Sequence, residues 1–320
     1  SGNGSYTTPA GETPLDDTFR DTRVALSTQY QHQLSRLWLY SGGVYLSKEY
    51  DYLALSINSA LARDFNNRNT TASVGFAYAY DAIEPEGGIP APGVSVDDPD
   101  NRLEDSETKQ TLDLLFGLTQ VINRQTLMQL NYSISDVSGY QTDPFKILSV
   151  VDSDGWANDY VYENRPDQRT KQSLFWRTKY NIQPSGQVFD VSYRYFWDDW
   201  GMASHTIDTK WRMLLKNNHF IEPHIRYYNQ QAADFYRVYL DEGQLIPEYM
   251  TADYRLGEIQ TYTIGLKYGL PIAGNEFSVR LEYYLTQVSG DDTLAKGPGM
   301  TDADLYPDKS AIMLQSFYRF

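Results

Sequence analysis

The sequence lacks cysteine, long apolar runs and any excess of positive charge. The absence of cysteine fits an oxidising envelope compartment, where stray thiols are a hazard. No run of 18 apolar residues occurs and the mean hydropathy is −0.54, which excludes a helical membrane protein. The net charge of −15 argues against a nucleic-acid partner, because phosphate binding needs a basic face.

Strands with one apolar and one polar face are the main positive signal. In segment 203–216 the apolar face includes Ile207 and Trp211, whereas the other face is wholly polar and includes Asp208 and Lys210. Side chains alternate across a strand, so this pattern predicts a sheet with one greasy and one wet face. The same alternation occurs in segments 187–198, 254–270 and 276–288.

Three further features favour a membrane barrel over a soluble sandwich, which also alternates. The strands are about ten residues long, the tilted span of a bilayer. Aromatic residues gather near strand ends, as at 195–200. Short turns alternate with long loops along the chain. The sequence therefore predicts an all-β fold, a transmembrane antiparallel β-barrel of the bacterial outer membrane with lipid and lipopolysaccharide around it.

The acidity of the chain is confined to four long loops. Together they hold 25 acidic and 8 basic residues, whereas the remainder holds 17 and 19. Long outer loops and short periplasmic turns are the expected asymmetry of such barrels. We predict one barrel domain over 1–320, with a loop-like extracellular segment 1–16, a periplasmic C-terminus and extracellular acidic loops at 83–109, 136–170, 229–253 and 287–309.

The chain ends on an alternating aromatic strand. Tyr318 and Phe320 share one face with Ile312 and Leu314. Chain ends usually fray and are polar, so a soluble protein seldom ends this way. The ending resembles the C-terminal signal by which outer-membrane proteins are recognised, which makes Tyr318 and Phe320 a predicted contact for the assembly machinery.

The strand count is odd. The pattern predicts about thirteen strands, whereas single-chain bacterial barrels have even numbers with both ends in the periplasm. The preferred interpretation is that upstream strands, three or one, complete a barrel of roughly 14–16 strands. The alternative is a complete barrel of about 12 or 14 strands whose N-terminal residues are misread.

Several blocks of the sequence are similar to an uncharacterised Gram-negative outer-membrane family, a domain of unknown function with the number thirty-five seventy in its series. The blocks are 63–66, 140–146, 165–170, 193–201 and 226–236. The resemblance implies the barrel fold and additional strands before a loop like residues 1–16. It also implies redox-type envelope proteins as partners, by association alone, and gives almost no chemistry.

Charged residues crowd the predicted lumen face. They suggest a polar channel that sorts small solutes, while a salt-bridged interior that only holds the wall is the alternative. Both descriptions apply to the same residues: Arg177, Lys179, Asp190, Arg194, Asp208, Lys210, Arg212, Glu222, His224, Arg226, Lys267, Arg280 and Glu282.

Metal binding and hydrolysis are the two kinds of chemistry that other parts of the sequence suggest. Asp152 and Asp154, followed by glycine, resemble the opening of a calcium loop, and the acidic rim would attract Ca²⁺ or Mg²⁺; the alternative is a solvated acidic turn. No other cofactor is expected. A rim hydrolase would use Asp198, Asp199, Ser204 and His205, but adjacent strand residues point to opposite faces, which excludes a Ser204–His205 dyad.

The four histidines show no metal-ligand spacing. The sequence therefore predicts a non-enzymatic barrel that serves as a pore or as a scaffold for envelope partners. A surface-rim hydrolase is the alternative.

Overall fold

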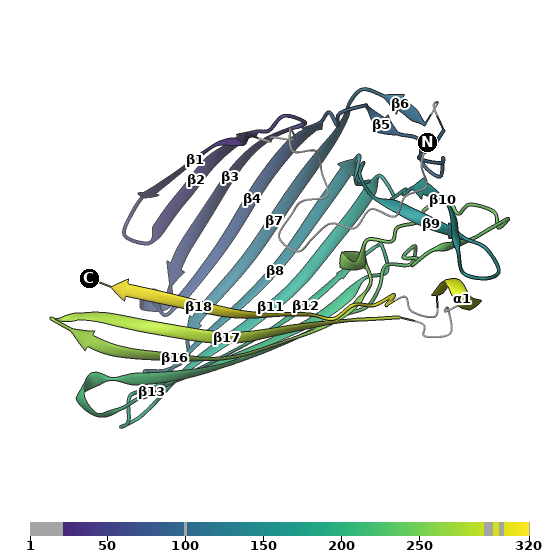
Figure 1. Cartoon of the computed structure of the whole chain (residues 1–320). Coiled ribbons are helices and arrows are strands. Elements are labelled where there is room, and N and C mark those ends of the chain that lie inside the picture. The colour runs from purple at the N-terminus through teal and green to yellow at the C-terminus, as the bar shows by residue number, and fades with distance from the viewer. Residues whose placement is uncertain (1–21, 99–100, 291–296, 301–303, 320) are drawn as a thin grey trace.

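The protein is described here by a computed structural model covering residues 22–98, 101–290, 297–300 and 304–319 (Figure 1). The predicted segment 1–16 and Phe320 lie outside these residues. One large sheet dominates. Its strands are β1 (Val24–Gln33), β2 (Trp38–Lys48), β3 (Tyr52–Phe65), β4 (Thr70–Ile83), β7 (Glu107–Val121), β8 (Thr126–Gly139), β11 (Gln168–Ile182), β12 (Gln187–Asp198), β13 (Ala203–Leu214), β14 (Phe220–Gln230), β16 (Glu258–Ile272), β17 (Asn275–Ser289) and β18 (Lys309–Arg319).

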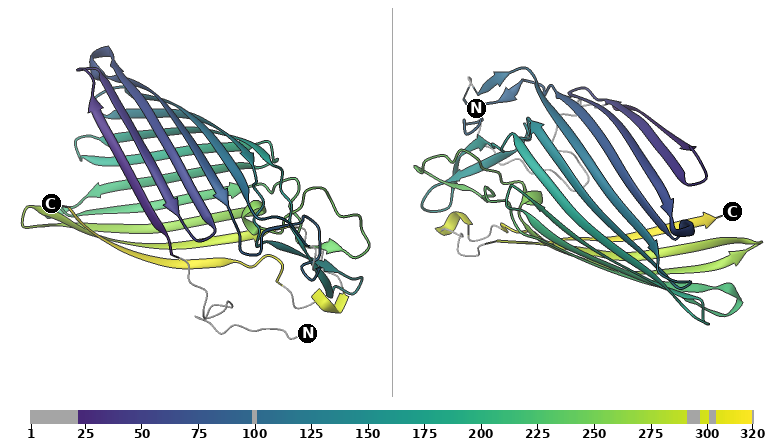
Figure 2. Two further views of the ribbon diagram at one scale, coloured as in Figure 1. Left: turned by 90° about the horizontal axis from the view of Figure 1, so that it is seen from above. Right: turned by 180° about the vertical axis from the view of Figure 1, so that it is seen from behind.

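The large sheet is an antiparallel meander in which each strand pairs with the next one along the chain. Its thirteen strands confirm the predicted number. Figure 2 shows the sheet curling round, with β1 and β18 as its two edges. Within the described residues these two strands are not paired with each other.

The two faces of the sheet differ as the alternation predicts. The apolar face leaves large side chains exposed: Ile207 is 46% exposed, Ile225 59% and Ile264 62%. A continuous apolar surface of this kind needs an apolar surrounding. On the polar face, side chains reach each other over intervening strands, as Arg212 of β13 reaches Glu276 of β17. This reach is possible because the polar face lies inside the curve of the sheet.

The two ends of the strands carry different connections. At the turn end, short 3₁₀ turns η1 (Asn66–Arg68) and η2 (Lys216–Asn218) join the strands, with asparagine in the left-handed region. Asparagine tolerates this region better than most residues. At the loop end lie short elements: β5 (Ile89–Pro90), β6 (Arg102–Glu104), β9 (Ile147–Val151), β10 (Ala157–Tyr162), β15 (Leu240–Asp241), η3 (Tyr254–Leu256) and α1 (Gly297–Met300).

Two of the predicted acidic loops fold together at the loop end. We call residues 140–167 and 231–257 the cap. In the cap, β9 pairs with β10 and, in parallel, with β15, and Leu148, Leu240 and Met250 form a small buried core. The sequence patterns did not predict this sheet. No helix in the described part of the chain is long and apolar enough to cross a membrane.

Candidate functional site

Strand register places all thirteen predicted lumen residues on the polar face. Most of them form ion pairs. Arg177 donates to both carboxylate oxygens of Asp190, at 2.8 Å from Nε and 2.5 Å from Nη2, and Lys179 Nζ lies 3.6 Å from the same carboxylate. This bidentate geometry fixes the pair more firmly than a single contact would.

A second cluster centres on His224, which is buried between two carboxylates. Its Nε2 lies 2.9 Å from Asp208 Oδ2, and its Nδ1 lies 2.6 Å from Glu282 Oε1. Lys210 Nζ lies 3.2 Å from Asp208 Oδ1. Gly265, between β14 and β17, makes room for this contact, because a Cβ there would lie 2.6 Å from Glu282 Cγ.

The remaining predicted residues complete the wall. Arg280 Nη2 lies 3.3 Å from Glu222 Oε1, and Arg212 Nη2 donates to Glu276 over 2.8 Å. Lys267 Nζ stands 4.9 Å from the ring centroid of Phe317. These contacts fit the salt-bridged wall as well as they fit a channel, so both descriptions of the polar face stay open.

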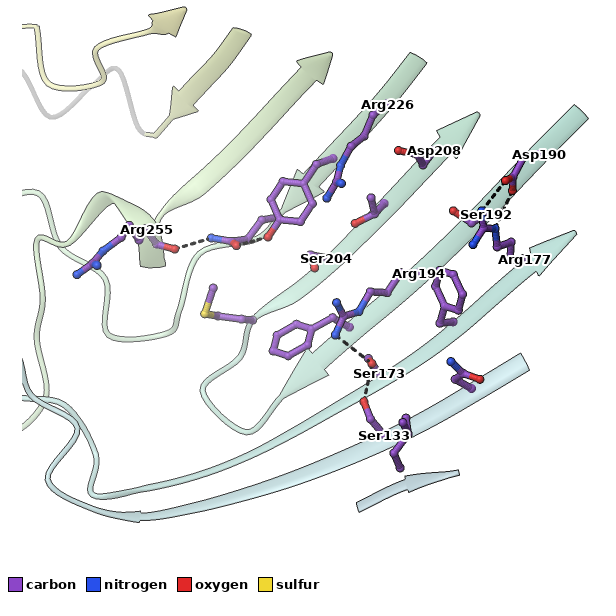
Figure 3. A pocket seen from close by; sticks show the side chains of 18 of the residues that line it. Ser133, Ser173, Arg177, Asp190, Ser192, Arg194, Ser204, Asp208, Arg226 and Arg255 are labelled. Carbon is purple, nitrogen blue, oxygen red and sulfur yellow. Dashed lines mark hydrogen bonds and ion pairs between the residues drawn. The ribbon is translucent and has the colours of Figure 1, made fainter. Parts of the chain in front are cut away.

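A cavity of about 840 Å³ lies on the polar face, directly below the cap. Side chains from β8, β11, β12, β13 and β14 line it, and Arg255 and Leu256 of η3 lie over it. Figure 3 shows Arg194, Ser204 and Arg226 projecting from three successive strands. Both arginines are exposed to the lumen.

Aromatic and polar contacts fasten the cap above this cavity. Trp200 packs edge-on against Phe235 at 5.1 Å, and its Nε1 donates to the carbonyl of Gln168 over 2.9 Å. Gln230 Nε2 donates to the carbonyls of Arg255 (3.0 Å) and Gly257 (2.8 Å). The cap is thus joined to the strand ends through both an apolar cluster and side-chain hydrogen bonds.

Buried charges hold the cap itself together. Glu163, only 1% exposed, pairs with Arg165 at 2.7 Å and accepts a hydrogen bond from Thr251. Arg165 Nη2 also donates to Asp253 over 3.0 Å. Burial opposes ionisation of Asp253, but hydrogen bonds from Arg255 and the charge of Arg165 outweigh it and lower the pKa of that carboxyl to about 2.

The calcium candidates Asp152 and Asp154 lie in a turn whose backbone N–H groups are hydrogen-bonded within the turn. Asp152 Oδ1 accepts the backbone N–H groups of Asp154 and Trp156, each over 2.9 Å. Among the described residues, no group of three or more His, Cys, Asp or Glu side chains is arranged to hold a metal ion. Ca²⁺ or Mg²⁺ binding at Asp152 and Asp154 stays a prediction.

The hydrolase candidates have other partners. Asp198 accepts from Arg169 Nε at 2.8 Å and from the backbone N–H groups of the turn that follows, and Asp199 accepts from the N–H of Thr170. Ser204 lines the cavity, whereas His205 lies on the opposite face, 2.7 Å from the hydroxyl of Tyr193. Asp198 and Asp199 thus stabilise the turn between β12 and β13, and Ser204 and His205 lie too far apart in direction to act on one substrate.

Of the two residues of the predicted assembly signal, the structure describes Tyr318. Its hydroxyl accepts from Asn275 Nδ2 over 2.8 Å, across the pair β17–β18. Phe320 lies outside the described residues.

Sequence reasoning missed the convergence of the cap with the cavity. A signal was present, because four of the five family-like blocks meet here. Blocks 140–146, 165–170, 193–201 and 226–236 supply cap or rim residues, and block 63–66 lies at the turn end. The alternation of apolar and polar residues within one strand does not indicate which loops pack together at the strand ends.

Two solved structures share the fold. The siderophore receptor PirA from Acinetobacter baumannii is 10% identical with a TM-score of 0.53, covering 93% of this chain and 50% of that one. A mutant of the ferric enterobactin receptor PfeA from Pseudomonas aeruginosa is 12% identical with a TM-score of 0.52, covering 85% and 43%. The chain thus spans about half the length of these receptors or less, and the likeness shows the fold alone.

Comparison with curated proteins gives no match. The model of the family described as "Protein of unknown function (DUF3570)" matches residues 1–320, the full length of the chain. The chain belongs to this family and has the β-barrel fold of outer-membrane proteins.

Proposed function

We propose that the chain forms a pore for small polar solutes in the bacterial outer membrane. In this arrangement the cap faces the cell exterior, and the turn end faces the periplasm with the C-terminus. The apolar face contacts lipid and lipopolysaccharide, and Tyr318 and Phe320 engage the assembly machinery. The wall of ion pairs around an open cavity is the observation that carries the proposal, because a lumen lined by charged groups favours water and solutes.

The distribution of apolar packing supports this assignment. In the described residues, the two buried hydrophobic clusters lie at the loop end, around Trp200 and around Leu148. The polar face holds ion pairs and the cavity instead. A filled structural lumen would bring side chains together across the interior.

A scaffold for envelope proteins is the second candidate, with redox-type proteins as the suggested partners. The cap carries exposed apolar side chains that a partner would cover: Leu245 is 94% exposed, Phe145 65% and Trp156 57%. Co-purification from native outer membranes tests this candidate. A stoichiometric envelope protein released by Leu245→Ser and Trp156→Ser would favour the scaffold.

Conductance in planar bilayers tests the pore. The purified protein should give steady unitary currents that disappear when the protein is heat-denatured. A correctly folded protein that gives no current would show a closed wall and overturn the pore.

The surface-rim hydrolase has less support, since Asp198 and Asp199 are engaged in turns and Ser204 and His205 lie on opposite faces. A hydrolytic activity that is lost in His205→Ala and Asp199→Asn would restore it.

A further inference from the structure

The cavity below the cap is basic, although the chain as a whole is acidic. Six arginine or lysine side chains line it against two aspartates, Asp190 and Asp208, which is a balance of +4. The net charge of the whole chain is −15. An excess of one sign in a recessed site attracts solutes of the opposite sign.

Most of these basic side chains already have carboxylate partners. Arg177 pairs with Asp190, and Lys210 and His224 share Asp208. At the cap, Arg169 pairs with Asp198 and Arg255 with Asp253. Both aspartates that line the cavity are therefore engaged, and their charge is offset locally.

Arg194 and Arg226 are different. No carboxylate of the described residues lies within ion-pair distance of either one. Arg194 Nη2 contacts only a hydroxyl, donating to Ser173 Oγ over 3.3 Å, and Ser173 in turn shares a 2.7 Å hydrogen bond with Ser133. Guanidinium groups present planar, forked donors that match carboxylate and phosphate oxygens.

The two arginines lie close enough to act together. They sit on β12 and β14, on either side of β13, and are offset by two residues along the strands. Their backbones are therefore separated by about 12 Å, a distance that two long arginine side chains can span together. On the same face of β13, Thr206 lies opposite Arg194 and Asp208 lies opposite Arg226. Thr206 offers a hydroxyl donor, and the charge of Asp208 is already offset by Lys210 and His224. The arrangement offers one small anion charged donors on two sides and the hydroxyl of Thr206 between them.

We propose that Arg194 and Arg226 form a binding site for a small oxyanion, recognised through its carboxylate or phosphate oxygens. The proposal deepens the pore assigned above by naming the class of solute. The binding step itself does not depend on conductance, because the site is complete on the wall of the sheet.

Equilibrium titration of the full chain in detergent tests the site, with inorganic phosphate and citrate as separate probes. Arg194→Gln and Arg226→Gln should each weaken binding by about tenfold, the value of losing a charge-assisted hydrogen bond. Arg212→Gln is the matched control, since it removes the same charge from the same face at a residue paired with Glu276. It should change binding less than twofold or so.

The two probes identify the source of the oxyanion. Binding of phosphate alone assigns phosphate-bearing solutes, and binding of citrate alone assigns carboxylates. Failure of both probes to bind the correctly folded protein would overturn the proposal, and so would equal weakening by Arg212→Gln. Conductance without anion binding would support the pore and contradict the anion site. Anion binding without conductance would support the site and contradict the pore.

Discussion

The polar face has two halves of different chemistry. On β1, β2, β3, β4, β7 and β8 it carries mostly serine, threonine, asparagine, glutamine, glycine and alanine. The charged exceptions on these strands are Asp64, Asp81, Glu107, Lys109 and Asp113. On β11–β14, β16 and β17 the same face carries the ion-pair clusters. We call these the neutral half and the charged half.

The two halves differ in the size and the charge of the side chains that line them, and in the proposed pore this would make one wall spacious and the other selective. In the neutral half small residues let neighbouring polar side chains lie flat: a Cβ on Gly117 would stand 2.5 Å from Ser73 Oγ. In the charged half each buried charge needs a partner, since an unpaired one is costly. The paired groups therefore fix the wall, whereas Arg194 and Arg226 have no carboxylate of the described residues within ion-pair distance and are the groups to which the proposed anion would bind.

The first test asks whether the neutral half and the charged half meet directly, by pairing of the edge strands β1 and β18. An exposed strand edge in hydrocarbon leaves N–H and C=O groups unpaired at several kcal/mol each, so we expect further strands, from this chain or another, between β1 and β18. Cysteines at Thr28 and Ile312 should then form no disulfide in outer membranes. The chain has no native cysteine to interfere.

Leu281 and Leu314 provide the matched pair for that experiment, since they are register partners on β17 and β18. Cysteines there should cross-link, because directly opposed strand residues fall within disulfide range. Efficient cross-linking of positions 28 and 312 would mean that β1 and β18 meet directly and that thirteen strands close the barrel.

The second test asks whether the two halves differ on their outer surface. Ile207→Arg in the charged half and Ile57→Arg in the neutral half each place a charge on the apolar face. Both should cost about 2–4 kcal/mol near the middle of the membrane. Urea titration of the protein folded into lipid vesicles measures this.

Thr206→Arg and Asn58→Arg are the controls, because each lies beside the tested residue but on the polar face. They should cost much less. Equal tolerance on both faces would contradict the assignment of the apolar face to lipid.

The strand number and the two faces were predictable from the sequence, because alternation is a local property of each strand. Ile207 and Asp208 identify their faces without any knowledge of their neighbours. Register adds little uncertainty when turns are short, as at Asn217, because each strand must pair with the next.

The cap and the cavity were not predictable in the same way. Glu163, Arg165 and Asp253 come from two loops separated by about 90 residues of sequence, and nothing periodic marks their meeting. The pairing state of Arg194 was equally hidden. Charge on a strand face is visible in the sequence, but which carboxylates are already engaged depends on geometry across several strands.

The cap should become less stable in acid. Because the cap is attached to the ends of strands in the charged half, this effect should be confined to that half. The pKa of Asp253 is about 2 in the folded protein and lies below its ordinary value near 3.8. The carboxylate therefore stabilises the cap above about pH 4, and this contribution, about 2 kcal/mol, is lost as the pH falls towards 2. Hydrogen exchange of residues 250–256 measures it.

Asp253→Asn should exchange faster at pH 7 and show less change between pH 5 and pH 2. Asp167→Asn alters an exposed carboxylate in the same cap and should behave as the original protein does. Identical pH profiles for all three proteins would exclude Asp253 as the acid-sensitive group.

The smallest effect is expected from narrowing the neutral half. Ala77 lies on the polar face of β4, between Asn58 and Asp113, away from the charged clusters. Ala77→Trp adds bulk to the wall without adding charge, so unitary conductance should fall while the preference between anions and cations stays the same. Phe76→Trp, on the apolar face, should change neither. A change in ion preference with Ala77→Trp would show that the neutral half also selects, and the division between a spacious wall and a selective wall would then be wrong.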